Sequence, residues 1–188
     1  AGHLLRNAAN CHNLKRSQRD GGEVWLGDPM EAALRDFAGQ HGERGDGQRL
    51  GELAFDSDRR RMSVIVDNDG ARWLYCKGAP EVVVQLCTQV EHDGRAILLG
   101  EQGMQQIARA QEAMADSGLR VLAFAYRKLA PDEIPAEREL VFSGLIGLHD
   151  PPRPEVPEAM ARCRSAGIKV IMVTGDHPHT ALAIAREI

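Results

Sequence analysis

Residues 61–77 read RMSVIVDNDGARWLYCK, two runs of β-forming residues joined by Asp-Asn-Asp-Gly. β-Branched and aromatic residues favour strands, and an Asp-Gly step favours a tight turn between antiparallel strands. The stretch therefore predicts a β-hairpin. We assume a register in which Val66 pairs with Ala71. Counting outward from that pair places Lys77 across from Arg60, in the segment FDSDRR.

Two helices are expected before this hairpin. Residues 4–16 space their apolar side chains close to every 3.6 positions, which predicts the first helix. The second begins at GDPMEAALRDFA, where Asp28 is a typical N-cap, Pro29 fits the first helical position and Glu31 occupies the place of a capping-box acid. Residues 39–52 are polar and glycine-rich and predict a loop.

Helices and strands alternate after the hairpin. A short helix is expected from Pro80 to about Cys87, and a longer one over residues 101–116 with Gly118 as its C-terminal cap. The runs RVLAFAYR and FSGLIGL predict strands, with a proline-containing loop at residues 130–137 between them.

The order of elements changes at residue 142 to strand, helix, strand, helix. The helix of residues 155–166 ends at Gly167, the second strand is IKVIMVT, and the last helix starts near residue 178. A βαβα run implies neighbouring parallel strands with a right-handed crossover. We therefore expect an α/β (α+β) chain of two parts: an antiparallel sheet flanked by helices over residues 1–141, and a partial, Rossmann-like segment over 142–188.

The second part holds too few strands for a complete parallel sheet. Its strands, within residues 142–173, should expose an edge and apolar surface, and we expect either poor order or pairing with another copy. The chain begins without methionine and stops within a helical pattern, so we expect a fragment of a longer protein.

Composition excludes several classes of protein. The formal charge of −4 with interspersed arginines gives no basic field for nucleic acid. The four cysteines form no Cys-x-x-Cys pair, and no histidine cluster has zinc-ligand spacing, so no metal site is expected. No run of about 18 apolar residues and no signal-peptide pattern occur, which predicts a soluble chain.

Two loops of the βαβα segment have the character of a phosphate site. HDPPR and TGDHPHT each follow a strand, and the carboxyl ends of parallel strands meet at one edge of a sheet. Thr174 and the amide of Gly175 suit a phosphoryl oxygen, and Asp176 suits an ion, an amide or a helix cap. The sequence Asp150-Pro-Pro by itself is common in turns. The phosphate-handling edge is therefore inferred from the two loops together.

Phe55 and Lys77 each admit two interpretations. Phe55 is either a core contact or a platform on which a flat heteroaromatic ring stacks, with Met62 either in the core or as a soft wall. Lys77 is either a snorkelling surface lysine or a ligand group, and Gly78 and Ala79 would let another group approach the backbone closely. Glu31 likewise either caps its helix or accepts a hydrogen bond from an adenine amino group.

The segment VIVDNDG at residues 64–70 admits an enzymatic alternative. It matches the start of haloacid-dehalogenase-type phosphatases, which would make Asp67 a nucleophile. The following ARWLYC returns at once as a strand, however, whereas such a nucleophile sits in a loop that leaves the sheet. A hairpin turn explains the same residues.

Six segments occur in an order typical of one protein family. They read GDPMEAAL, FDSDRRRMSV, KGAPE, GLRVLAFAYR, DPPRPEV and VIMVTGDHPHTA. In this combination the chain resembles the P-type cation-transporting ATPases of the calcium and sodium/potassium pump-like class, from about residue 3 to 188. The resemblance implies a nucleotide-binding domain over 1–141 and the start of the returning half of a haloacid-dehalogenase-like phosphorylation domain over 142–188.

The resemblance also implies roles for single residues. Phe55 would stack on adenine, Glu31 would approach its edge, and the other ATP-binding positions would be Ser57, Met62, Lys77, Gly78, Ala79 and Arg120. In the second part, the nucleotide and phosphate loops would be carried by Asp150, Arg153, Thr174, Gly175 and Asp176. Met30 departs from the threonine that is commoner in the family, which leaves Glu31 in place.

Missing segments limit the implied activity. Neither the Asp-Lys-Thr-Gly-Thr phosphorylation segment nor the Gly-Asp-Gly magnesium segment is present, so no catalytic residue and no metal ligand is expected here. The chain should bind ATP without turning it over, at the cytoplasmic face of a membrane, as part of a pump whose other domains are its partners and in which Mg²⁺ accompanies ATP. The non-enzymatic alternative is a partner-binding module that uses the loops at 40–52 and 130–137.

Overall fold

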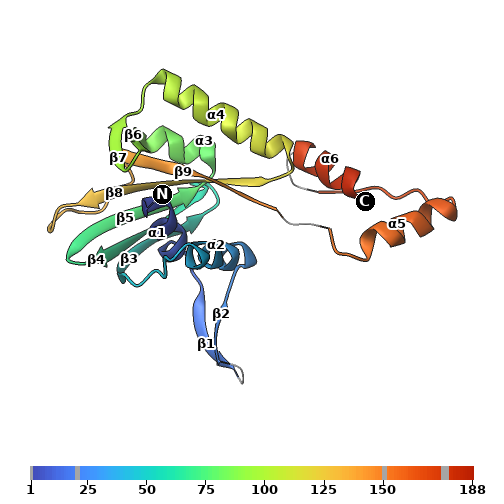
Figure 1. Ribbon diagram of the computed structural model, residues 1–188, viewed down its shortest axis with the longest axis horizontal. Helices are drawn as coiled ribbons and strands as arrows, with labels where there is room; N and C mark the ends of the chain where they lie inside the picture. Colours follow the sequence, from blue (N-terminus) through green and yellow to red (C-terminus); the bar gives the residue numbers. More distant parts are fainter. Residues whose placement is uncertain (1, 20–21, 150–151, 175–177) are drawn as a thin grey trace. The chain divides into compact units, whose positions relative to one another are not determined.

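The computed structural model describes residues 2–19, 22–149, 152–174 and 178–188 (Figure 1). Its helices are α1 (Gly2–Asn10), α2 (Pro29–Gln40), α3 (Pro80–Val83) followed by the 3₁₀ turn η1 (Val84–Leu86), α4 (Glu101–Asp116), α5 (Val156–Ser165) and α6 (Pro178–Glu187). Its strands are β1 (Lys15–Arg19), β2 (Gly22–Leu26), β3 (Gln48–Asp56), β4 (Arg61–Asn68), β5 (Ala71–Gly78), β6 (Cys87–His92), β7 (Arg95–Leu98), β8 (Arg120–Leu129) and β9 (Leu140–Leu148).

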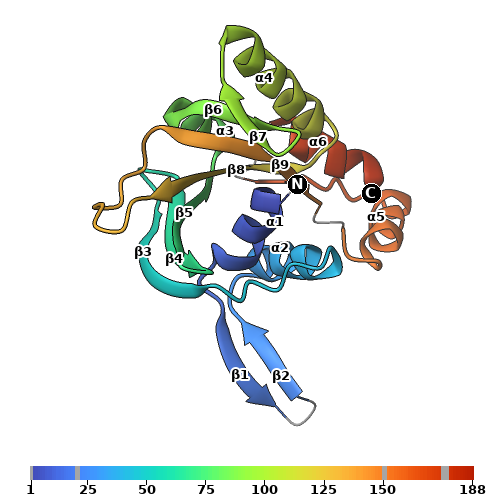
Figure 2. The same cartoon turned by 60° about the vertical axis from the view of Figure 1, so that its left-hand side comes forward.

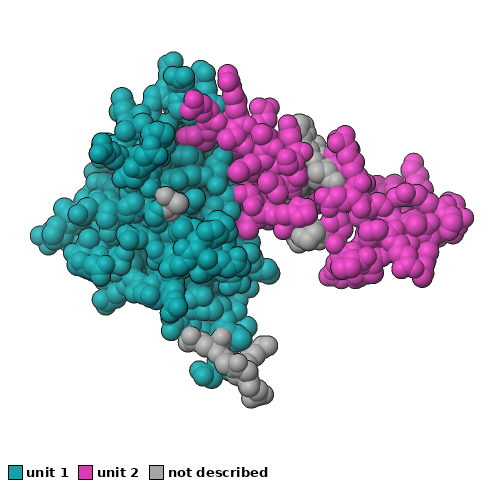
Figure 3. Space-filling model, in the orientation of Figure 1, with its two compact units in different colours: residues 1–105, 122–146 teal, residues 106–121, 147–188 magenta. Residues whose placement is uncertain are grey.

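The chain divides into two compact units. The first comprises residues 1–105 and 122–146, and the second comprises 106–121 and 147–188 (Figure 3). In the carboxyl-terminal part of the chain, the boundary between the two units lies between Ile146 and Gly147. The domain boundary expected at residue 141 stays a prediction about the intact protein.

A seven-stranded sheet forms the frame of the first unit. Its strand order is β3-β4-β5-β8-β9-β6-β7, and the hairpin of β1 and β2 stands apart from it (Figures 1 and 2). β3, β4, β5 and β8 pair antiparallel, whereas β6 pairs parallel with β9 through Leu140, Val141 and Phe142. The predicted fold class, a large sheet with flanking helices, is confirmed. The parallel pair was not predicted, because its two strands lie far apart in the sequence.

The predicted hairpin of β4 and β5 is confirmed, but its register is wrong by two residues. Asn68 pairs with Ala71, so the turn has two residues, Asp69 at φ 53° and Gly70 at φ 76°. Positive φ at both positions is typical of a type I′ turn, whose twist matches that of the strands. Consequently Lys77 lies opposite Met62 and not opposite Arg60.

The core of the first unit lies where the amino-terminal segment meets the middle of the sheet. The buried side chains that pack together there are Cys11, Met62, Val64, Val66, Tyr75, Tyr126 and Val141. Asn7 ties α1 to this sheet, because its Nδ2 donates to the carbonyl oxygens of Cys76 and Ala125, both at 2.9 Å. The sheet therefore positions the segment that follows α1.

The first predicted helix is too long. α1 ends at Asn10, and Lys15–Arg19 instead form β1, paired antiparallel with β2. Cys11 and Leu14 are buried as the period suggested, but they lie in the segment between α1 and β1, which is neither helix nor strand. The apolar spacing therefore predicted the burial of Cys11 and Leu14 correctly. It predicted the helix correctly only as far as Asn10.

Besides β1 and β2, three further strands were not predicted from the sequence: β3, β6 and β7. β3 includes residues 48–52 of the predicted loop, and it is an edge strand that is largely exposed, so it carries no alternation of apolar side chains. β6 and β7 form a second hairpin with Asp93 (φ 49°) and Gly94 (φ 74°) at the turn. The loop between β8 and β9, which covers the predicted 130–137, is confirmed.

The helices of residues 101–116 and 156–165 are confirmed, with their glycine caps. Gly118 has φ 77° and the amide of Leu119 donates to the carbonyl of Met114; Gly167 has φ 71°. The predicted strand IKVIMVT is wrong, since residues 168–174 are not assigned to a strand. A strand requires a hydrogen-bonded neighbour, and no described strand pairs with this segment.

Large apolar side chains on this segment are exposed. They are Ile168, Val170, Ile171, Met172 and Val173, with exposed fractions from 42% to 91%. No helix in the described part of the chain is long and apolar enough to cross a membrane.

Candidate functional site

β3, β4 and β5 lie side by side in the sheet (Figure 2), and their register brings three predicted site residues into one row. Met62 on β4 pairs with Lys77 on β5. On the other side, the β3–β4 pairing steps from Leu53↔Ser63 to Asp56↔Arg61, so Ala54 and Phe55 together oppose Met62 in a β-bulge. Phe55 and Lys77 are therefore two strand spacings apart, about 10 Å between backbones.

Phe55 presents its ring to solvent. Its exposed fraction is 60%, so the interpretation as a core contact is wrong. Met62, by contrast, is 2% exposed and packs in the core cluster. An exposed aromatic ring on an ordered strand end has a free face for stacking.

Lys77 and Glu31 form a nearly buried ion pair. Lys77 Nζ lies 2.8 Å from Glu31 Oε1, and the exposed fractions of the two side chains are 8% and 13%. The snorkelling interpretation of Lys77 is therefore wrong, because the ammonium group points to a carboxylate and not to water. Burial of both charges is tolerated because each offsets the other.

Glu31 does not act as a capping-box acid. Its Oε2 accepts a hydrogen bond of 2.8 Å from the amide of Asn13, in the segment that follows α1. α2 is instead capped by Asp28 alone, whose Oδ1 accepts from the amides of Met30 and Glu31 at 2.8 and 3.3 Å. Asp28 and Pro29 thus start the helix as predicted, and that start places the Glu31 carboxylate beside Lys77.

Two neighbours of this pair, His12 and Cys11, are neutral at pH 7. Burial lowers the pKa of His12 to about 4, and its Nδ1 accepts a hydrogen bond from the amide of Leu14. Burial raises the pKa of Cys11 to about 11. A thiol held neutral is a poor nucleophile, so this part of the site suits binding and not covalent chemistry.

Hydrogen bonds to the side chain and the carbonyl of Asp56 stabilise the turn between β3 and β4. Asp56 Oδ1 accepts from the amides of Asp58 and Arg59 at 2.9 and 2.8 Å, and these N–H groups, that of Arg59 foremost, lower the pKa of Asp56. The amide of Arg60, whose φ is 48°, donates to the Asp56 carbonyl at 2.6 Å. Ser57, another predicted residue, lies exposed on this turn.

Gly78 and Ala79 lie against the same turn. The Ala79 amide donates to the carbonyl of Arg60 at 3.0 Å, and a Cβ on Gly78 would meet that oxygen at 2.5 Å. The close approach that the glycine permits is therefore that of the Arg60 backbone. Ala79 then starts α3 with Pro80 in its first turn.

Glu137, in the loop between β8 and β9, was missed by the sequence analysis. Its side chain is 6% exposed; Oε2 lies 2.9 Å from Arg59 Nη1 and 2.7 Å from Arg61 Nε, and Oε1 accepts from Ser63 Oγ at 2.8 Å. These partners lie 74–78 residues away in sequence, and no local pattern marks the carboxylate.

Six further predicted residues lie in the second unit or outside the described residues. Arg120, Arg153 and Thr174 belong to the second unit and are exposed. Three predicted residues lie outside the described residues: Asp150, Gly175 and Asp176.

Asp67 occupies a structural position. It lies in β4, and its Oδ1 accepts a hydrogen bond of 2.9 Å from the Gly70 amide across the turn. The hairpin interpretation of VIVDNDG is confirmed, and β5 returns directly beside β4.

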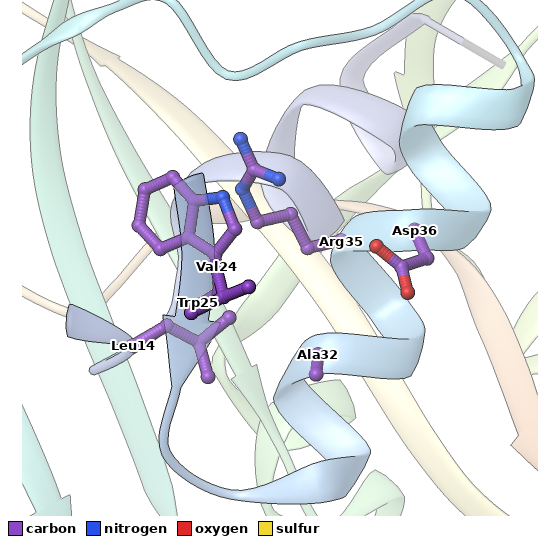
Figure 4. A pocket seen from close by; sticks show the side chains of 6 residues that line it. All are labelled: Leu14, Val24, Trp25, Ala32, Arg35 and Asp36. Atoms are coloured by element: carbon purple, nitrogen blue, oxygen red, sulfur yellow. The ribbon is translucent and has the colours of Figure 1, made fainter. Parts of the chain in front are cut away.

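A hollow of about 270 Å³ lies between the β1–β2 hairpin and α2, and none of the predicted residues lines it (Figure 4). Its lining residues are Leu14, Val24, Trp25, Ala32, Arg35 and Asp36. Arg35 covers the indole of Trp25, with Cζ 3.9 Å from the ring centroid, and Arg16 lies 4.9 Å from the same centroid. The Arg35–Trp25 contact links the hairpin to α2, whereas the Arg16–Trp25 contact lies within the hairpin.

Within residues 2–19, 22–149, 152–174 and 178–188, no three His, Cys, Asp or Glu side chains cluster so as to hold an ion.

Comparison with known proteins gives a consistent family. Residues 2–155 match the family described as P-type ATPase, cytoplasmic domain N. The chain is 40% identical to the "Calcium-transporting ATPase" of Bacillus subtilis over 98% of the chain and 22% of that protein. It is 37% identical to "Calcium-transporting ATPase 1" of Lactococcus lactis (98% and 22%) and 37% identical to the "Sodium/potassium exporting P-type ATPase cta3" of Schizosaccharomyces pombe (98% and 19%).

The chain spans about a fifth of the length of these curated relatives. Their names differ in the ion transported, while the matched segment is shared. By the match of residues 2–155 to cytoplasmic domain N and by an identity of 40% to one relative over nearly its whole length, the chain belongs to the P-type ATPases.

Proposed function

We propose that this chain binds ATP for a P-type cation pump and positions the γ-phosphate for transfer to an aspartate outside its 188 residues. The observation that carries the proposal is the row of Phe55, Met62 and Lys77, in which an exposed ring stands two strands from a fixed ammonium group. The family match supports the same conclusion.

Phe55 supplies the stacking surface in this proposal. The face of a phenylalanine ring attracts a flat heteroaromatic base by dispersion and by removal of apolar area from water. Because 60% of Phe55 is exposed, a base that covers the ring gains this burial without displacing a protein side chain.

Glu31 and Lys77 supply the recognition of adenine. A carboxylate acceptor and an ammonium donor lie 2.8 Å apart, which suits an edge that offers an amino donor next to a ring-nitrogen acceptor. Guanine carries an O6 acceptor where adenine carries its amino group, so the same pair would face guanine with mismatched groups. We therefore expect ATP to bind more tightly than GTP.

The other predicted contacts complete the proposal. Further nucleotide contacts are assigned to Ser57, Gly78, Ala79 and Arg120, and the phosphate loops of the phosphorylation domain to Asp150, Arg153, Thr174, Gly175 and Asp176. Phosphoryl transfer depends mainly on such positioning and on offsetting charge. Mg²⁺ is proposed to arrive bound to the ATP phosphates.

Position in the intact protein follows from the same assignment. The chain would lie at the cytoplasmic face of a membrane and work with the remaining phosphorylation, actuator and transmembrane domains of the pump. The Asp-Lys-Thr-Gly-Thr segment is not among the 188 residues, so we expect this chain to bind ATP without hydrolysing it.

An ATP titration followed by amide NMR tests the proposal. Saturable shifts are expected at Glu31, Phe55 and Lys77, with weaker binding of GTP. Phe55→Ala should lose most of the affinity, whereas Phe37→Ala, a control that removes a ring 37% exposed on α2, should retain it. Absence of any saturable shift in the unchanged chain would refute ATP binding.

A further inference from the structure

Three consecutive arginines, Arg59 to Arg61, occupy the turn that follows Phe55. Like charges this close repel one another unless counter-charges lie nearby. Arg60 pairs with Glu81 at 2.6 Å on the surface. Arg59 and Arg61 share the single carboxylate of Glu137, at 2.9 and 2.7 Å.

Both oxygens of the Glu137 carboxylate form hydrogen bonds with side chains of this turn and of β4. Its side chain is 6% exposed, and both oxygens are used: Oε2 by the two guanidinium groups and Oε1 by Ser63 Oγ. Hydrogen bonds between a carboxylate and guanidinium groups are among the strongest in proteins, and a low dielectric strengthens them. The loop of residues 130–139 is thereby fixed to the β3–β4 turn.

A chain of contacts leads from Glu137 to the backbone of Phe55. Arg59, held by Glu137 through Nη1, donates through Nη2 to the carbonyl of Ala54 at 2.6 Å. On the other side of Phe55, Asp56 accepts the amide of Arg59. Arg59 therefore donates hydrogen bonds to the residues on both sides of Phe55, which are Ala54 and Asp56.

The position of the Phe55 ring depends on these hydrogen bonds. With 60% of the side chain exposed, packing does little to hold the ring, so the backbone decides where it stands. A binding group that is already in place loses less conformational entropy when its ligand arrives.

We propose that Glu137 is a positioning residue for the adenine site: through Arg59 and Arg61 it holds the β3–β4 turn so that Phe55 presents an open face to the base. This inference rests on the proposed ATP binding. Glu137 itself touches no nucleotide in this scheme; its effect passes through Arg59 to the Ala54–Asp56 backbone.

The experiment measures ATP affinity of the full 188-residue chain by calorimetry, for the unchanged protein and for Glu137→Gln. Glutamine keeps the shape but removes the charge, so affinity should fall roughly tenfold as the site loses pre-organisation. Glu133→Gln is the matched control. Glu133 lies in the same loop but pairs with Arg127 on β8 and makes no described contact with Arg59 or Arg61, so its variant should bind ATP as the unchanged chain does.

A double-mutant cycle separates positioning from general damage. If Glu137 acts through Phe55, then Glu137→Gln in a Phe55→Ala background should cause no further loss of affinity. Amide hydrogen exchange without ATP provides a second readout: exchange at residues 58–60 should accelerate in Glu137→Gln while that of β5 stays unchanged. Equal losses in both backgrounds would overturn the positioning role.

Arg59→Gln covers the case in which Glu137→Gln does not fold. It leaves the Arg61–Glu137 contact but removes the guanidinium group that binds both Glu137 and the Ala54 carbonyl, so it should weaken ATP binding to a similar degree. If the unchanged chain binds ATP and both variants bind it equally well, the inference is wrong and the proposed function stands. If the unchanged chain binds no ATP, the proposed function fails first.

Discussion

Lys77 and Glu31 show how a charged residue can be buried and still serve a surface site. Each is neutralised by the other at 2.8 Å, and Glu31 also accepts the Asn13 amide. Removing one member of a buried pair leaves the other charge without its partner, which costs far more than the pair contributes.

Lys77→Met should therefore lower the free energy of unfolding by about 3 kcal/mol. The double variant Lys77→Met with Glu31→Gln should recover most of this loss, because no charge then stays buried. Urea unfolding followed by tryptophan fluorescence measures both. Lys169→Gln, at an exposed lysine, is the control and should change stability by less than about 0.5 kcal/mol. A loss of equal size in the single and double variants would contradict the paired-charge explanation.

His12 makes stability depend on pH in a defined direction. Burial lowers its pKa to about 4, from an ordinary value of 6.5, so the unfolded chain takes up the proton first as pH falls. The free energy of unfolding should therefore decline as pH drops from about 6.5 toward 4. Above pH 6.5, His12 is neutral in both states and the stability that it contributes is fully present.

His12→Asn keeps an acceptor for the Leu14 amide but does not titrate. Unfolding measured at several pH values between 7 and 4 should give a shallower decline in this variant than in the unchanged chain. Some decline should persist, because burial also lowers the pKa of His3 to about 4. Identical pH profiles for the two proteins would show that His12 does not contribute.

At the scale of elements, the β3–β4 turn is clamped from two sides. The Ala79 amide binds the Arg60 carbonyl from the start of α3, and Glu137 binds Arg59 and Arg61 from the β8–β9 loop. These contacts explain why KGAPE contains a glycine: the Arg60 backbone passes where a side chain at position 78 would lie.

Gly78→Ala should disturb this clamp. The new Cβ would meet Arg60 O at 2.5 Å and Arg61 Cα at 2.8 Å, so the strands must separate, at a cost of about 2 kcal/mol and with weaker ATP binding. Gly51→Ala on β3 is the control, because its Cβ would meet only Ile65 Cδ1, at an ordinary 3.6 Å. Thermal unfolding compares the two, and equal melting temperatures for both variants would show that the contact at position 78 relaxes freely.

At the scale of the whole molecule, the second unit exposes an apolar segment at residues 168–173. Val173 and Ile171 are 91% and 73% exposed, next to three further large apolar side chains. Contiguous exposed apolar surface favours association, whereas a single exposed residue does not.

Concentration-dependent association is therefore expected, and the double variant Ile171→Asp with Val173→Asp should reduce it. Light scattering over a range of protein concentrations measures the effect. Ile134→Asp, at an isolated residue 87% exposed in the β8–β9 loop, should leave the association unchanged. Association that is the same in all three proteins would place the contact elsewhere.

The sequence by itself determined the features that depend on neighbouring residues. The Asp28 cap, the bounds of α4, the Gly118 cap and the β4–β5 hairpin all follow from local hydrogen bonds and local φ preferences. Phe55, Lys77 and Glu31 were singled out with two interpretations each, because a residue type alone does not say whether a side chain is buried.

Only the tertiary structure decided the rest. β3 exists because β4 supplies its hydrogen bonds, and not because its own pattern is strand-like; β6 pairs parallel with β9 although the two strands lie far apart in the sequence. Glu137 meets arginines more than 70 residues away, which no local periodicity encodes. Burial, charge pairing and strand neighbours come from distant segments, so they appear only when the chain folds.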